Sequence, residues 1–265
     1  MWRADSGSGT RVLLLVHGCL ACAEQYAPLL RNLRPHYRRV WALDLPGFGV
    51  APALASPGLA ACLAWLARAL VTLALLEGQP VDAVGHSFGA FLLQASLHAH
   101  PGAQPAVRKL VLVSLGSLHP HLHLGWHDTW RTVWWGTCFK YRLLGGAVRR
   151  LAQYAPWLLA WLPAYMQRWV GSERGEALVS ECVQAGWPRW LRPAIPTIAT
   201  LRVPVALLWG EEDPMFPHEQ ARRFAVAHNL PLLSLAGCGH QPLLTPEGAT
   251  LIRLALLRAT CVGHC

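Results

Sequence analysis

The chain has 265 residues, of which 53% are hydrophobic and 14% are charged, and its formal net charge is +9. This composition is too apolar for a disordered chain, and the length suffices for one α/β domain with a large core. The positive charge favours acidic partners. However, the sequence has no basic arm, zinc-ligand spacing or RNA-binding motif, so nucleic acid is not an expected partner.

The N-terminal residues predict a protein that stays in the cytoplasm. The segment MWRADSGSGT is polar, and the apolar run VLLLV that follows it is shorter than the core of a signal peptide. Residues 59–76 approach the length of a membrane span, but Arg68 lies in their middle. We therefore expect this segment to be a helix packed against a sheet.

The eight cysteines do not form the spacing of a disulfide framework. Cys19 and Cys22 match the C-x-x-C redox pattern, and Cys261 and Cys265 flank His264 at the C-terminus. Patterns this short arise easily by chance, so free thiols in a reducing compartment are the favoured interpretation. No metal site is expected.

The order of apolar segments along the chain predicts alternating strands and helices. Continuous apolar runs predict buried strands at residues 11–16, 38–47, 81–85, 107–114, 203–210 and 230–237. Helical spacing of apolar residues predicts helices at residues 23–34, 59–76, 88–100, 218–229 and 247–259. This alternation favours an α/β fold in which helices flank both faces of a mostly parallel sheet of about six strands.

Polar residues follow several of these strands, at the sheet edge where α/β proteins gather their chemistry. Ser87 stands between Gly85 and Gly89, directly after one strand and before one helix. A tight strand-to-helix turn needs small neighbours because it brings the backbone close to other atoms. The turn would hold the serine hydroxyl out from the sheet, at the positive end of the helix.

A serine nucleophile needs a base, and the base needs a carboxylate that orients it. His240 follows the sixth predicted strand and Asp213 follows the fifth. Glu211 and Glu212 compete with Asp213 for the acid role. Asp213 is favoured because Pro214 marks the end of a loop that would aim its carboxylate inward.

Five segments in this order resemble the α/β-hydrolase fold family across nearly the whole chain: VHGCLACAEQYAPLL, DLPGFG, GHSFG, WGEEDPMFP and GCGHQPLLTPE. The resemblance implies that Ser87 is the nucleophile, Asp213 the acid and His240 the base. It also implies an oxyanion hole formed by the backbone N–H groups of Cys19 and Phe88. The residues around these groups would support the elbow and its loops: His17, Gly18, Gly85, His86 and Gly89.

The chain departs from the family pattern at its beginning. Members usually start with a β-hairpin, but only eleven residues precede Val12, so the N-terminal hairpin is expected to be reduced or missing. The resemblance divides the rest into a hydrolase core, residues 1–116 and 201–265, and a helical cap inserted after the fourth strand, residues 117–200.

The predicted cap is rich in aromatic and basic residues. It holds nine of the thirteen tryptophans, and its nine Lys/Arg against four Asp/Glu give a net +5. Most of these rings would form the cap's own core, but some are expected to line an apolar substrate pocket, with Trp126, Trp130, Trp134 and Trp135 as candidates. The basic excess suggests an acidic acyl carrier protein or an anionic membrane surface as a partner. The DLPGFG pattern is shared with pimeloyl-carrier-protein methyl ester esterases of this family.

Serine at the elbow favours acyl transfer, because relatives that attack an sp³ carbon carry aspartate there. The expected function is cofactor-free hydrolysis of a small-molecule carboxylic ester, thioester or lactone with an apolar part. Three alternatives keep the same residues: a carbon–carbon bond hydrolase, a cofactor-free haloperoxidase and a hydroxynitrile lyase. A non-catalytic ligand-binding member is less favoured because it has no need of an intact triad.

Overall fold

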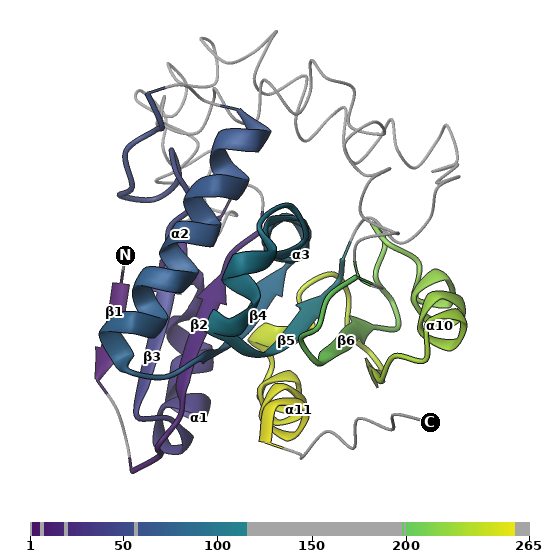
Figure 1. Ribbon diagram of the computed structural model, residues 1–265. Coiled ribbons are helices and arrows are strands. Elements are labelled where there is room, and N and C mark those ends of the chain that lie inside the picture. Colours follow the sequence, from purple (N-terminus) through teal and green to yellow (C-terminus); the bar gives the residue numbers. More distant parts are fainter. Residues whose placement is uncertain are drawn as a thin grey trace, which may run out of the picture.

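The computed structural model describes residues 2–5, 8–18, 21–55, 58–115, 198 and 200–257. Within these residues the chain forms one seven-stranded sheet in the order β1-β3-β2-β4-β5-β6-β7 (Figure 1). The strands are β1 Trp2–Asp5, β2 Val12–Val16, β3 Arg39–Leu43, β4 Val81–His86, β5 Val107–Val113, β6 Val205–Gly210 and β7 Leu232–Leu235. All neighbours pair in parallel except β1, which lies antiparallel to β3. The predicted α/β sheet with six parallel strands is confirmed.

The N-terminal edge of the sheet is short, as expected. One four-residue strand, β1, stands where the family has a hairpin, and it pairs Trp2 with Ala42 and Asp5 with Arg39. Within the described residues, this strand forms the edge of the sheet next to β3. The sequence did not predict this strand, because four residues are too few to display a periodic pattern.

Helices cover both faces of the sheet. One face carries α2 Leu59–Glu77, α3 Phe88–Ala99 and α10 His218–Ala227, and the other carries α1 Ala27–Leu33 and α11 Pro246–Leu257 (Figure 1). Along β2, Val12, Leu14 and Val16 enter the first core while Leu13 and Leu15 enter the second. Successive side chains of a strand point to opposite faces, so a fully apolar strand supplies both cores.

The first predicted helix is divided into three segments. A 3₁₀ turn over Ala23–Tyr26 precedes α1, and a second 3₁₀ turn over Arg34–His36 follows it. Pro28 stands in the first turn of α1, where its missing N–H is not needed, and Pro35 stands in the second 3₁₀ turn. The prolines therefore mark where the geometry changes.

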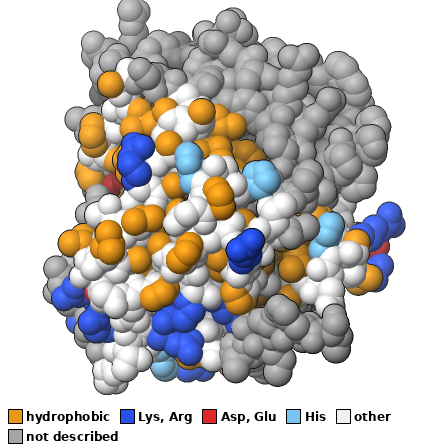
Figure 2. Space-filling view, in the orientation of Figure 1, with side chains coloured by type: hydrophobic (Ala, Val, Ile, Leu, Met, Phe, Trp, Pro, Cys, Tyr) orange, Lys and Arg blue, Asp and Glu red, His pale blue; other side chains and the backbone are white. Residues whose placement is uncertain are grey.

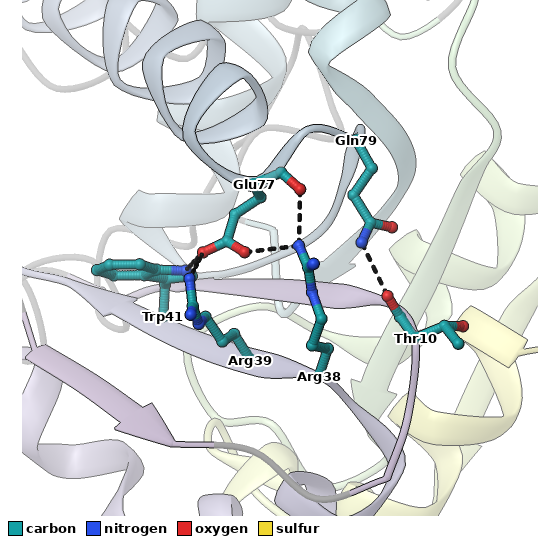
Figure 3. Close-up of polar contacts among 6 residues, drawn as sticks. All are labelled: Thr10, Arg38, Arg39, Trp41, Glu77 and Gln79. Carbon is teal, nitrogen blue, oxygen red and sulfur yellow. Dashed lines mark hydrogen bonds and ion pairs between the residues drawn. The ribbon is translucent and has the colours of Figure 1, made fainter.

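A buried carboxylate ties the end of α2 to β3. Glu77 is the last residue of α2, its side chain is 1% exposed, and it accepts hydrogen bonds from Arg38 at 2.8 Å, Arg39 at 3.1 Å and the Trp41 indole at 2.9 Å (Figure 3). Arg38 also donates to the backbone carbonyl of Glu77 at 2.6 Å, which satisfies one acceptor of the last helical turn. The next residue, Gly78, ends the helix with a φ of 66°.

The segment predicted as a helix against the sheet is α2, and that prediction is confirmed. Cys62, Leu66, Leu70 and Leu73 are buried in the core beneath it. By length and composition alone α2 could also cross a membrane, and only 28% of its most apolar window is buried. The predicted cap, residues 117–200, lies outside the described residues except for Ile198 and Thr200.

Candidate active site

Ser87 stands on a strained turn between β4 and α3. Its φ of 51° and ψ of −114° lie in a region that residues with a side chain rarely adopt. Its N–H donates to the Val113 carbonyl at 2.8 Å, and its carbonyl accepts from the Phe91 N–H at 3.1 Å. These bonds tie the strained residue to the neighbouring strand β5 and to the first turn of α3, which hold it in place.

The two glycines of the elbow are there because no side chain fits. A Cβ on Gly85 would lie 2.6 Å from the Cα of Ala90. A Cβ on Gly89 would lie 2.6 Å from the Val16 carbonyl oxygen and would also collide with that of His17. All of these are backbone atoms, which move only if the strand or the helix moves. The backbone around the turn thus leaves no room for a side chain at Gly85 or Gly89.

His240 and Asp213 meet, although they follow different strands. The His240 Nδ1 lies 2.9 Å from the Asp213 Oδ2, and the exposed fractions of their side chains are 15% and 0%. A carboxylate accepts hydrogen bonds, so Nδ1 carries the proton and Nε2 of the neutral ring keeps a lone pair. A histidine in this state is ready to accept a proton at Nε2.

The acid loop supports Asp213 from several directions. The other carboxylate oxygen, Oδ1, accepts the N–H groups of Met215 at 2.9 Å and Phe216 at 3.0 Å. Burial acts to raise the pKa of Asp213, but the bonds from His240, Phe216 and Met215 outweigh it and leave the pKa below its usual value. The carboxylate is thus ionised at neutral pH.

Glu211 and Glu212, the competing carboxylates, are exposed, whereas Asp213 is buried. Only Asp213 of the three makes a hydrogen bond to His240 among the described residues. Phe216, which sequence reasoning did not single out, packs its ring against His240 at a centroid distance of 5.2 Å. Its carbonyl accepts the Trp209 indole N–H at 2.8 Å. No pattern in the sequence marks Phe216, because its role depends on the fold of the loop.

His86 connects the elbow to the histidine loop. Its Nε2 lies 2.8 Å from the backbone carbonyl of His240, and the two rings are 5.0 Å apart. A carbonyl only accepts, so His86 carries its proton on Nε2. Burial, together with the neighbouring His240, lowers the pKa of His86 to about 3. His86 is therefore neutral and ties the main chain of His240 to the residue that precedes Ser87.

His17 has a comparable supporting position. Its Nε2 accepts the Leu45 N–H at 3.0 Å, and its Nδ1 donates to the Gly18 carbonyl at 2.8 Å. Burial lowers the pKa of His17 to about 4, against the opposing effects of the Gly18 carbonyl and Asp44. The neutral ring links the loop after β2 to the loop after β3.

Asp44 organises the DLPGFG loop. Its Oδ1 accepts the Ala23 N–H at 2.7 Å and its Oδ2 accepts the Val50 N–H at 3.2 Å. Gly49 closes the turn around it with a φ of 54°, and a Cβ at Gly49 would collide with the Asp44 carboxylate. Because β2 to β7 are parallel, the polar residues that follow β2, β3, β4, β6 and β7 lie at the same edge of the sheet.

Of the remaining predicted site residues, Phe88 lies within the described part of the chain and the others named below lie outside it. Phe88 is the first residue of α3, so its N–H lies at the positive end of that helix. Cys19 lies outside the described residues, as do Trp126, Trp130, Trp134 and Trp135. Within the part of the chain that the structure describes, no group of three or more His, Cys, Asp or Glu side chains is arranged to hold a metal ion.

Comparison with known proteins identifies the family. The family model described as alpha/beta hydrolase fold matches residues 11–246. The chain therefore belongs to the α/β hydrolase fold family, as its resemblance predicted. No curated protein matches the chain by sequence.

Solved structures share this fold at low sequence identity. A thermophilic esterase from Thermogutta terrifontis is 17% identical, with a TM-score of 0.65 over 96% of this chain and 92% of that one. The Bacillus megaterium epoxide hydrolase is 16% identical, with a TM-score of 0.69 over 97% and 96%. The 2-hydroxy-6-oxo-6-phenylhexa-2,4-dienoate hydrolase from Rhodococcus sp. strain RHA1 is 17% identical, with a TM-score of 0.69 over 97% and 93%.

Proposed function

We propose that this protein is a serine hydrolase that cleaves carboxylic esters, thioesters or lactones through an acyl-enzyme intermediate. The observation that carries the proposal is the backbone of Ser87, whose φ of 51° is kept between two glycines that accept no side chain. Strain of this kind persists only when the surrounding structure imposes it, and it gathers at functional sites. A serine displayed in this way is typical of acyl transfer.

In the proposed reaction, His240 Nε2 takes the proton of Ser87 as the Ser87 oxygen attacks the carbonyl carbon of the ester. Asp213 holds the resulting imidazolium through its bond to Nδ1. The backbone N–H groups of Phe88 and Cys19 stabilise the oxyanion. The alcohol leaves with the proton from His240, and a water molecule that His240 activates then releases the acid from Ser87.

The substrate we propose has an apolar acyl or alcohol part, on the strength of the tryptophan-rich segment between β5 and β6. The three fold relatives named above are, by their names, an esterase, an epoxide hydrolase and a hydrolase of 2-hydroxy-6-oxo-6-phenylhexa-2,4-dienoate. Serine rather than aspartate at the elbow favours an acyl intermediate over attack on an epoxide carbon. A carbon–carbon bond hydrolase with the same three residues is the alternative that the test must separate.

The test combines an active-site label with a substrate series. A fluorophosphonate probe is expected to label Ser87, and p-nitrophenyl esters of rising chain length are expected to be hydrolysed. Ser87→Ala is expected to abolish labelling and to lower kcat/KM by at least about a thousandfold. Ser96→Ala, which removes a buried hydroxyl elsewhere on α3, serves as the matched control and should keep both.

Two results would count against the proposal. Labelling that persists in Ser87→Ala would mean that Ser87 is not the nucleophile. Labelling of Ser87 without hydrolysis of any ester in the series would favour the carbon–carbon bond hydrolase, because the nucleophile would be intact but the substrate class wrong.

A further inference from the structure

The solvent-facing side of α2 is unusually apolar for a helix on the outside of an α/β domain. Arg68, Val71, Thr72 and Leu75 follow one another at the i, i+3, i+4, i+7 spacing of a single helix face, and all four are exposed. Together with Leu76 they are called here the α2 outer face. Leu75 is 77% exposed and Leu76 is 72% exposed. An amphipathic surface helix carries charged or polar residues on its outer face; Arg68 and Thr72 fit that pattern, whereas Val71, Leu75 and Leu76 do not.

Composition makes the same point for the helix as a whole. The mean hydropathy of its most apolar 18-residue window is 2.1, yet only 28% of that window is buried. Figure 2 shows orange hydrophobic side chains gathered over the part of the surface where α2 and α3 lie in Figure 1. Apolar surface that the fold leaves uncovered commonly marks a site of interaction with a membrane or another protein.

Arg68 is the charged member of the α2 outer face, and it is basic. Between residues 25 and 115 the chain has three acidic residues, Asp44, Glu77 and Asp82, and all three are buried. Arg68 lies on the face itself and is exposed. At the end of the helix two arginines meet the single carboxylate of Glu77, so that cluster carries a net charge of +1 (Figure 3).

We propose that the α2 outer face docks the protein on the surface of a bilayer with anionic headgroups. A bilayer interface offers an apolar layer for Val71, Leu75 and Leu76 and negative headgroups for the arginines around them. Arg68 is compatible with this position, because a long basic side chain can place its stem along apolar surface and its guanidinium among the headgroups. The buried side of α2 stays packed on the sheet, so the helix lies along the membrane and does not cross it.

A second copy of the chain fits this face less well. A two-fold contact between α2 outer faces would bring Arg68 and its neighbours toward the same arginines of the partner, and like charges across an interface are unfavourable. An acidic protein would match the charge but would have to cover a leucine pair at the helix end. A bilayer supplies both kinds of surface along the length of a 19-residue helix.

The experiment measures binding of the purified full chain to vesicles by flotation. Vesicles of phosphatidylcholine mixed with phosphatidylglycerol are compared with vesicles of phosphatidylcholine alone. The chain is expected to float with the anionic vesicles, and added salt is expected to weaken this binding. The double variant Leu75→Ser/Leu76→Ser should lower the partition coefficient at least about tenfold, because both side chains lose the gain of apolar burial. Arg68→Glu should lower it at least about fivefold.

Matched controls come from α10, which lies at the other end of the sheet from α2 (Figure 1). Val226→Ser removes an apolar side chain that is 75% exposed, and Arg223→Glu reverses a side chain that is 77% exposed. Both should bind vesicles like the unaltered chain. Hydrolysis of a soluble p-nitrophenyl ester should be unchanged in the α2 variants.

Three outcomes would overturn the proposal. One is absence of binding to anionic vesicles. Another is binding that the α2 variants keep, which would assign membrane attachment to a different surface. The third is that the chain does not bind vesicles and that the α2 variants change its oligomeric state or lose binding to an acidic acyl carrier protein. The α2 outer face would then be a protein interface. Ser87→Ala should bind vesicles normally, so failure of the proposed hydrolase activity and failure of docking can be told apart.

Discussion

Acidification is expected to destabilise this protein through two buried histidines beside the elbow. His17 and His86 are 0% and 3% exposed, and burial lowers their pKa values from 6.5 to about 4 and to about 3. In the unfolded chain both rings take up a proton as the pH falls through 6.5. The folded state resists protonation until the pH approaches 4 or 3. Below pH 6.5 the unfolded state therefore binds more protons, and stability falls with pH.

The size of the effect follows from the gap between these pKa values. A solution at about pH 5 is about 1.5 units below the pKa of the two histidines in the unfolded chain, so both rings are protonated there. In the folded chain both rings are still neutral at this pH. Each histidine then costs about 2 kcal/mol of unfolding free energy, or about 4 kcal/mol for the pair. A typical domain has about 5–15 kcal/mol in total, so the loss is substantial.

The assay is urea unfolding followed by tryptophan fluorescence at about pH 7.5 and about pH 5. His86→Asn is expected to start from a lower stability, because the bond to the His240 carbonyl is altered, but to lose about 2 kcal/mol less on acidification. His228→Asn changes an exposed histidine after α10 and serves as the control, with the same pH dependence as the unaltered chain.

An equal loss of stability on acidification in His86→Asn and in the unaltered chain would show that His86 does not contribute to the pH dependence. A second measurement does not depend on the variant folding. In NMR spectra of the unaltered chain, the ring carbon signals of His17 and His86 should not titrate between about pH 7.5 and about pH 5. Titration of both signals near pH 6.5 would show that burial does not keep these rings neutral.

Other predictions concern the elbow, the acid and the end of α2. Gly89→Ala should lower unfolding free energy by several kcal/mol in urea titrations, whereas Gly102→Ala, with nothing within 4 Å of the added carbon, should cost less than about 1 kcal/mol. Asp213→Asn should lower kcat on esters by about 10³–10⁴-fold because His240 would meet the wrong partner, and an equal loss in Glu212→Gln would contradict this assignment. Glu77→Gln should cost about 1–2 kcal/mol of stability, because Arg38 and Arg39 lose a charged partner but keep contact with solvent; a thermal shift no larger than that of exposed Glu212→Gln would argue against it.

Local patterns account for the parts of the fold that the sequence predicted. A strand buried on both faces must be apolar throughout, so β2 and β4 are visible as continuous runs. The elbow is visible because a turn that brings Gly89 against the backbone of another strand excludes any side chain. Apolar periodicity and small residues at a turn can be recognised within a few residues of the chain, which is why residue order was sufficient for β2 to β7, for the main helices and for the turn at Ser87, but not for the four-residue strand β1.

Contacts between distant residues could not be derived in this way. The sequence left three neighbouring carboxylates as candidates, and only the folded loop turns Asp213 inward to His240 while Glu211 and Glu212 stay exposed. The bond from His86 to the His240 carbonyl joins residues 154 positions apart, so no local spacing encodes it.

The sequence by itself thus predicted the class of fold, the turn that carries Ser87 and the chain order of the candidate partners Asp213 and His240, because these depend on local sterics and periodic burial. Tertiary structure decided which carboxylate faces the histidine, which rings are buried neutral and which side of α2 meets solvent. An apolar residue on a helix can point to the core or away from it, and only packing chooses between them. Leu73 is buried while Leu75, two positions later, is 77% exposed, although the two side chains are identical in chemistry.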